Sequence, residues 1–422
     1  MEKQLLIGIN ERPKSVWKWI VLSLQHVFAM FGATVLVPIL TGLDASVALV
    51  ASGVGTLIYI LCTKGKVPVY LGSSFAYIAA ISVAGSVNGF SSAYVGLMAV
   101  GIVYVIVALI IRFLGKDWIE KLLPPVVIGP VIIIIGLSLA PISIASAGFD
   151  GSAGWATPIV AIITFLTVVA ISIFAKGFFK IVPFICAIIV GYIAAVAFGL
   201  IDLSTIFADY TFLQFPSFTF IGTYQLDFDA VLMFLPIAFV TIAEHIGDHT
   251  VLGEVCGENF LVSPGLDKTL MGDGIATFVS AAMGGPANTT YGENTGVVAI
   301  TRVGSVYVLG LAACFAVLLG FFGYVQAFIN SIPQAVIGGM TIVLYGLIAG
   351  NGVKVLIRSR VNLAKTRNLI IVSTMLVLGL GGAALPINAA VNLTGMSLAA
   401  VVGIVLNLVL PKPHEANDDV MI

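Results

Sequence analysis

Hydrophobic residues fill most of this chain in runs long enough to cross a membrane, and short polar stretches separate the runs. Fourteen such windows can be counted, several of them interrupted by Gly or Pro. They centre near residues 28, 53, 78, 103, 131, 165, 190, 238, 276, 296, 313, 341, 374 and 402. The pattern predicts an all-α polytopic membrane protein with fourteen transmembrane segments.

The third and tenth windows are broken near their beginnings. Residues 70–75 (Tyr-Leu-Gly-Ser-Ser-Phe) and 288–293 (Asn-Thr-Thr-Tyr-Gly-Glu) favour extended backbone, and their glycines allow a turn into a helix. Only about ten residues after the second stretch look helical, which covers roughly half of a hydrocarbon core about 30 Å thick. Extended backbone at that depth needs partners from the protein. We therefore expect two short antiparallel β-strands that pair with each other.

Composition and charge agree with membrane insertion. The 422 residues are 59% hydrophobic and 9% charged, whereas soluble domains carry about 25% charged residues. With the N-terminus inside, all 19 Lys and Arg fall on the cytoplasmic side of the predicted segments, and the outer loops carry only acids. The chain is thus predicted to be a multi-pass protein of the cytoplasmic membrane with both termini in the cytoplasm.

An internal repeat relates the two halves. Residues 25–26 (Gln-His) and 244–245 (Glu-His) are 219 positions apart, and Pro68 and Pro286, which precede the broken stretches, are 218 apart. Seven segments per half is an odd number, so the halves must have opposite orientation. This 7+7 inverted repeat is typical of secondary transporters, whose broken segments meet near the membrane midplane.

Two acids and two helix starts mark a candidate site. Glu293 begins the short helix of the tenth segment, and Glu244 lies in the eighth, where a carboxylate usually indicates a substrate or ion site. Helix N-termini leave backbone amides free, here expected near Ser74 and Phe75 and near Gly292 and Glu293. These groups together offer both acceptors and donors to one ligand.

The ligand that suits these groups is small and planar, with alternating N–H and C=O groups. Phe75 and Tyr291 could stack on such a ring. Uracil fits, as does an oxidised purine such as xanthine or urate. A bare anion such as sulfate or bicarbonate fits poorly, because two carboxylates repel it and neither Lys nor Arg is available at that depth.

Import against a gradient requires a coupling ion. A carboxylate in a low-dielectric site accepts a proton more readily than one in water. Glu244 is the first candidate carrier and Glu293 the second, and Asp248, one helical turn from Glu244, could relay protons or stay solvated at the inner mouth. Sodium is the alternative coupling ion. Neither a cofactor, a metal site nor a nucleic-acid partner is expected, and the absence of nucleophile–base and nucleotide-loop motifs argues against an enzyme.

Structural interpretations compete with several of these assignments. Glu293 could be a carboxylate that ties broken backbone together, and Tyr345 an ordinary packing aromatic. A channel or receptor is the alternative from a different functional class. Further residues whose simplest interpretation is structural are Gln25 and His26 (interhelical hydrogen bonds), His245 and His249 (packing) and Asp273 (an interfacial acid).

At these residues the chain resembles the nucleobase–ascorbate transporter family (nucleobase:cation symporter-2), and within it the uracil permeases. The family signature is Gln, Glu or Pro, then Asn-x-Gly, four residues, Thr, and Lys, Arg or Gly. It is complete here in residues 293–302, and a Glu at its first position is typical of the uracil branch. The similarity extends through residues 23–38, 70–76 and 243–247 and covers essentially the whole chain.

The resemblance implies a proton symporter for uracil that works by alternating access. It implies a substrate-binding core domain (residues 1–115 and 229–325, segments 1–4 and 8–11) and a gate domain (116–228 and 326–412, segments 5–7 and 12–14), followed by a cytoplasmic tail (413–422). Homodimers are a further family expectation.

The resemblance also implies particular residue roles. Uracil would be held by Glu244, Glu293 and the backbone amides of Phe75 and Gly292, with Tyr345 closing from the gate side. His26 would brace Tyr291, and it joins Glu244, Asp248 and Glu293 as a candidate for proton coupling. One departure stands out: the best-known type within the uracil branch has His where this chain has Asp248. A neighbouring anion in place of His would favour protonation of Glu244.

Overall fold

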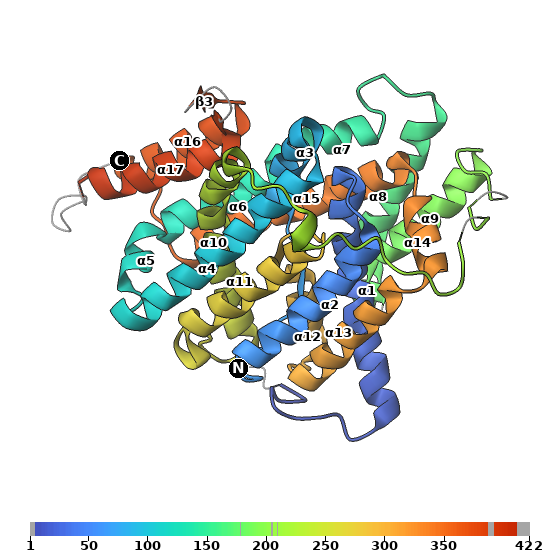
Figure 1. Cartoon of the computed structure of the whole chain (residues 1–422), viewed down its shortest axis with the longest axis horizontal. Helices are drawn as coiled ribbons and strands as arrows, with labels where there is room; N and C mark the ends of the chain where they lie inside the picture. Colours follow the sequence, from blue (N-terminus) through green and yellow to red (C-terminus); the bar gives the residue numbers. More distant parts are fainter. Residues whose placement is uncertain (1–4, 178, 204–205, 209, 387–391, 412–422) are drawn as a thin grey trace.

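The computed structural model describes residues 5–411 apart from 178, 204–205, 209 and 387–391 (Figure 1). The described chain is mostly helical. The predicted tail at 413–422 lies outside the described residues.

Helices from both halves of the sequence form a first group. Within this group α4 packs on α10 and α11, and α2 packs on α11 and α13. The bounds are α1 Val16–Thr41, α2 Ala45–Cys62, α3 Ile78–Asn88, α4 Phe90–Leu114, α10 Phe228–Cys256, α11 Leu266–Ala282, α12 Gly292–Thr301 and α13 Val306–Gly320. Small residues allow the closest of these approaches: a Cβ on Gly101 of α4 would lie 2.7 Å from the carbonyl oxygen of Gly274 on α11.

Most of the remaining helices form a second group. Here α15 packs on α6 and α8, and α16 packs on α6 and α17. The bounds are α6 Pro125–Ser138, α7 Ala140–Ser146, α8 Ala156–Phe174, α9 Pro183–Ala197, α15 Gln334–Arg358, α16 Thr366–Leu380 and α17 Gly395–Val409. The two groups touch where α1 meets α9 and where α10 meets α6 and α17.

Short elements complete the fold. They are the helices α5 Asp117–Leu122 and α14 Gly323–Asn330, the single turns η1 Phe75–Tyr77, η2 Phe179–Ile181, η3 Ile221–Thr223 and η4 Leu261–Gly265, and the strands β1 Leu71–Ser73, β2 Asn288–Thr290, β3 Ala384–Pro386 and β4 Asn392–Thr394.

The length and composition of the helices fit a multi-pass membrane protein. Among the described residues, seven helices are long and apolar enough to cross a membrane, and shorter apolar helices accompany them. The fourteen centres predicted from the sequence fall in α1, α2, α3, α4, α6, α8, α9, α10, α11, α12, α13, α15, α16 and α17. That every one of these segments crosses the membrane stays a prediction.

A two-stranded ribbon lies inside the first group. β1 and β2 pair antiparallel with Gly72 opposite Thr289, and both strands are buried. At each outer edge of the ribbon, a threonine side chain forms hydrogen bonds with backbone groups of the strand. Thr56 of α2 exchanges hydrogen bonds with the backbone of Leu71, and Thr277 of α11 does so with Asn288. β1 leads into η1 and α3, and β2 leads into α12, so the two helix starts lie beside the ribbon.

Candidate functional site

A cavity of about 290 Å³ lies between the two groups of helices. From the first group, it is lined by acids of α10 and by the turns at which β1 and β2 lead into helices. From the second group, it is lined mainly by apolar side chains. Its lining includes Phe75, Glu244, Asp248, Thr289, Thr290, Tyr291, Gly292, Glu293, Ile132, Phe184, Leu344, Leu347, Ile348 and Asn351, with Lys180 and Lys354 also present.

Three carboxylates converge on this cavity. Glu244 and Asp248 are one turn apart on α10, so both project from the same face of that helix. The Asp248 Oδ2 accepts a hydrogen bond of 2.5 Å from Thr290, whereas the buried Glu244 Oε2 has no hydrogen-bond partner among the described residues. Glu293 is the second residue of α12 and interacts with its own backbone amide. The cavity therefore presents strong acceptors that a ligand with N–H groups could satisfy.

Backbone donors come from the two helix starts. Phe75 begins η1 and Gly292 begins α12, positions at which helices leave amides without intrahelical partners. The prediction of a free amide at Ser74 is wrong, because that amide donates to the Ala287 carbonyl at 2.9 Å and extends the strand pairing. Ser74 also does not line the cavity. The donors left for the cavity are thus the amides of Phe75 and Gly292, since the Glu293 amide already meets its own carboxylate.

Three aromatic residues, Tyr291, Phe75 and Tyr345, lie at or near the cavity. The Tyr291 hydroxyl donates to the Ser73 carbonyl (3.1 Å) and accepts from Thr34 (3.3 Å). Its ring packs closely against Gly72 of the ribbon, since a Cβ on Gly72 would come within 2.3 Å of it. The Phe75 ring meets the Tyr345 ring edge-on at 6.2 Å. Tyr345 is buried, and it does not line the cavity in this conformation.

His26 has a different partner from the one expected. Instead of bracing Tyr291, the His26 ring accepts a hydrogen bond from the side-chain amide of Asn294 at 3.1 Å. The same side-chain amide also donates to the His26 backbone carbonyl at 3.1 Å. The expectation failed because a sequence does not specify which residue of α12 faces α1. These contacts join α12 to α1, and we expect them to hold the rotation of α12 and with it the direction of Glu293.

Several cavity residues were missed by sequence reasoning. Thr289 and Thr290 belong to β2, and Thr290 is the partner of Asp248. Asn351 comes from α15, where it lies 3.9 Å from the Cβ position of Gly292. A signal for Asn351 was present, because a Gly-Asn-Gly sequence (350–352) interrupts an otherwise apolar segment.

A polar cavity between two groups of apolar, membrane-length helices defines a membrane transport protein. The chain matches the Permease family over residues 17–388 and belongs to that family. It is accordingly a transporter and not an enzyme.

Individual relatives are similar over nearly their whole length. The chain is 48% identical over 419 residues to the uracil permease of Bacillus caldolyticus, covering 98% of this chain and 96% of that protein. It is 43% identical over 430 residues to the uracil permease of Bacillus subtilis (strain 168), covering 99% and 98%.

Among solved structures, the fold is similar to the transmembrane domain of the cyanobacterial bicarbonate transporter BicA. The TM-score is 0.64 with 15% sequence identity, over 94% of this chain and 99% of that one. At this identity the likeness concerns the fold alone.

Proposed function

We propose that this protein imports uracil across the cytoplasmic membrane together with protons. The observation that carries the proposal is the meeting of Glu244, Glu293 and the helix starts at Phe75 and Gly292 around one small cavity. Similarity to uracil permeases over nearly the full chain supports the same substrate.

The chemistry of the cavity matches the edge of a pyrimidine dione. The Glu293 carboxylate accepts from the imide N–H, and the amides of Phe75 and Gly292 donate to the flanking carbonyl groups. The Phe75 ring covers one face of the base. A base that lacks the N–H would leave a buried carboxylate unpaired, which costs more than the lost bond itself.

Glu244 is the proposed proton carrier. It is half-buried beside Asp248, and its buried Oε2 has no hydrogen-bond partner among the described residues. A proton on Glu244 would relieve the repulsion between these carboxylates and let the acid donate to a carbonyl of uracil. Binding of uracil and of the proton would then favour each other, as symport requires.

Symmetric packing supports the inverted seven-plus-seven arrangement. The α4–α11 contact has its counterpart in α13–α2, the α8–α9 contact in α17–α16, and the α1–α9 contact in α10–α17. Thr56 and Thr277 bond the two outer edges of the ribbon in the same way. We infer that the first helix group is the core domain, which carries the substrate, and the second group the gate domain.

Orientation follows from the lysines at the cavity. Lys180 and Lys354 both belong to the predicted cytoplasmic side. We infer that the N- and C-termini are cytoplasmic and that the cavity opens inward in this conformation.

Transport of an oxidised purine and exchange of anions are the two alternatives to uracil import. Xanthine or urate would use the same donors and acceptors but need more room. Anion exchange is suggested only by the similarity of the fold to BicA. The expectation that no Lys or Arg is available is wrong, because Lys180 and Lys354 line the cavity, but three carboxylates there still oppose the binding of an anion.

The test is uptake of labelled uracil by proteoliposomes that contain the purified full-length protein. We expect saturable uptake that is driven by an outside-acid proton gradient, abolished by a protonophore, and weakly inhibited by xanthine, urate or sulfate. Replacement of Glu244 by Gln should abolish the response to the proton gradient, whereas Asp229→Asn, an exposed acid in the first turn of the same helix, should leave it intact. Uptake that is linear and indifferent to the gradient would refute symport.

A further inference from the structure

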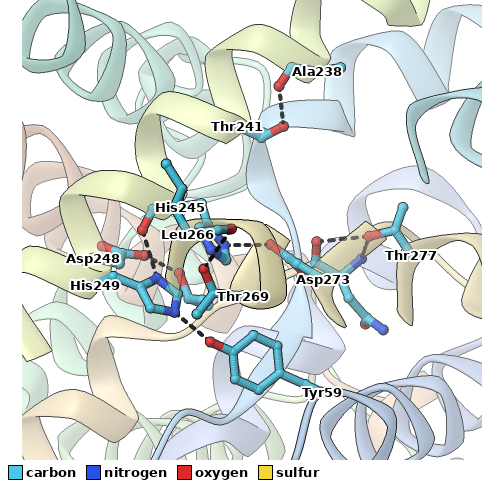
Figure 2. A network of polar contacts seen from close by, with 12 residues as sticks. Tyr59, Ala238, Thr241, His245, Asp248, His249, Leu266, Thr269, Asp273 and Thr277 are labelled. Carbon is cyan, nitrogen blue, oxygen red and sulfur yellow. Dashed lines mark hydrogen bonds and ion pairs between the residues drawn. The ribbon is translucent and has the colours of Figure 1, made fainter. Parts of the chain in front are cut away.

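A second polar face of α10 points away from the substrate cavity. Thr241, His245 and His249 follow one another at four-residue spacing (Figure 2). Thr241 meets Tyr77 of η1, whereas His245 faces α11 and His249 faces α2. Asp273 of α11 joins them. The prediction that Asp273 is an interfacial acid is wrong, because its side chain is completely buried and lies 2.9 Å from His245.

His245 and Asp273 share one proton. The 2.9 Å contact joins His245 Nδ1 to Asp273 Oδ2, so a single hydrogen lies between an imidazole and a carboxyl group. The other polar atoms of the pair, His245 Nε2 and Asp273 Oδ1, are buried and have no hydrogen-bond partner among the described residues. Asp273 is also near enough to Glu244 to interact with it electrostatically. The pair is thus an ionisable unit beside the substrate acids.

His249 has a fixed tautomer. Its Nδ1 lies 2.7 Å from the His245 carbonyl, which can only accept, so Nδ1 carries the hydrogen of the neutral ring. Its Nε2 then accepts from the Tyr59 hydroxyl of α2 at 2.5 Å. The His249 ring stacks on the His245 ring with centroids 4.0 Å apart.

A separate cavity begins at His249. It has a volume of about 1180 Å³ and lies between the N-terminal segment and the end of α10, with His249 almost fully buried at its lining. Glu11, Glu254 and Glu258 also line it. The predicted topology puts this cavity on the cytoplasmic side, separate from the one that holds Glu293.

We propose that His249 and Tyr59 form a gated route by which the coupling proton leaves the core domain for the cytoplasm without passing through the substrate cavity. The route rests on the proposed proton symport. Glu244 gives its proton to the His245–Asp273 pair, which lies near it. The pair then passes a proton to His249 Nε2, which becomes imidazolium after the Tyr59 O–H turns away. That proton then leaves for water in the cavity that Glu11, Glu254 and Glu258 line, and His249 returns to its neutral form.

The stacking of the two rings makes the route a gate. Their faces meet rather than their nitrogens, so transfer requires a ring to turn. A continuous chain of hydrogen bonds would let protons leak inward without uracil. The ionisable groups next to His249 are Tyr59 from α2 and His245 from α10, and Tyr59 in turn lies near Cys62 and Asp273. On the side of the cavity the ionisable groups are Cys256 and the three glutamates.

Two fluxes through the same proteoliposomes test the proposal. Net uptake driven by an outside-acid gradient requires proton release, whereas exchange of labelled for unlabelled uracil at equal concentrations does not. The variants are His249→Gln and Tyr59→Phe, and the control is Thr250→Ala, the next residue along α10, which lines the same cavity and does not titrate.

We expect His249→Gln to slow net uptake about tenfold or more while exchange stays within about twofold of wild type, since a positioned proton-transfer group contributes at least this much. Tyr59→Phe removes the hydroxyl that occupies His249 Nε2, so it should leave exchange unchanged but let protons enter the liposomes when uracil is absent. Thr250→Ala should change neither flux. Equal loss of both fluxes would mean a structural role, and unchanged net uptake would place proton release elsewhere, so either result overturns the route. If the rate of wild-type uptake did not depend on the proton gradient, the proposed symport would be overturned, and the route with it.

Discussion

The segment from β1 to α3 and the segment from β2 to α12 have the same backbone plan but different chemistry. Each is a buried three-residue strand followed by a short helix, and the two strands pair with each other. The first segment brings an aromatic side chain, Phe75, to the cavity, whereas the second brings a carboxylate, Glu293. The common plan supplies two helix N-termini, and the difference in side chains supplies an acceptor on one side only. A ligand with one N–H between two carbonyl groups suits this arrangement.

The anchoring of the two segments is also alike. The third residue of each helix start bonds the leading helix of the other half: Tyr77 of η1 bonds Thr241 of α10 at 2.7 Å, and Asn294 of α12 bonds His26 of α1. The two broken segments are thus held in matching ways, although the residue types differ. Each difference can be probed by a variant in one segment and its counterpart in the other.

The largest effect is expected at the centre of the ribbon. In Gly72→Ala the new methyl group would lie within 2.3 Å of the Tyr291 ring, and crowding of this kind typically costs about 1–3 kcal/mol or more. The ring and the start of α12 must move, so uracil binding should be lost and the melting temperature should fall. The control is Thr289→Val, at the position opposite Gly72. Because the valine side chain has nearly the same shape as that of threonine, this variant should unfold near the wild-type temperature. Normal binding by Gly72→Ala would show that the ribbon does not position the site.

The next effect separates the two helix starts by their chemistry. Glu293→Gln should weaken uracil binding about 10- to 100-fold, since a hydrogen bond to a charged acceptor contributes about 1.5–3 kcal/mol. Ser74→Ala, in the other segment, should stay within about twofold of wild type, because Ser74 does not line the cavity and its amide already pairs with Ala287. Equilibrium titration of the purified proteins with uracil measures both. Similar losses in the two variants would mean that the segments contribute equally.

A smaller effect should come from the anchor of the second segment. Asn294→Ala removes two hydrogen bonds of 3.1 Å and leaves the buried His26 ring without that donor, at a cost of about 1–3 kcal/mol of unfolding free energy. Because α12 could then rotate, uracil binding should weaken as well. Thermal unfolding and uracil titration of the same sample would show both losses, and a loss of stability with unchanged affinity would argue that His26 does not orient Glu293.

The smallest effect is expected at the anchor of the first segment. Tyr77→Phe removes one hydrogen bond to Thr241, whose hydroxyl keeps contacts with the backbone of its own helix, so about 1 kcal/mol or less should be lost. Uracil affinity should hardly change. A loss equal to that of Asn294→Ala would show that both anchors matter alike.

The sequence anticipates the backbone of the site better than its side-chain contacts. Gly, Pro and polar residues inside apolar windows indicate where helices break, and spacing along α10 puts Glu244 and Asp248 on one face. The partners of His26, the Ser74 amide and Asp273 depend on how helices distant in the sequence rotate against one another. The hydropathy pattern does not contain this information. An acid near the end of a predicted segment gives the same pattern whether its carboxylate is hydrated or hydrogen-bonded to His245.

The most direct test of the central claim is the affinity for 3-methyluracil, which lacks the imide hydrogen, relative to uracil in wild type and in Glu293→Gln. If the Glu293 carboxylate accepts the imide N–H, wild type should prefer uracil by about 10- to 100-fold, and the variant should lose most of that preference. The same preference in both proteins would show that Glu293 does not bind this hydrogen and would contradict the account.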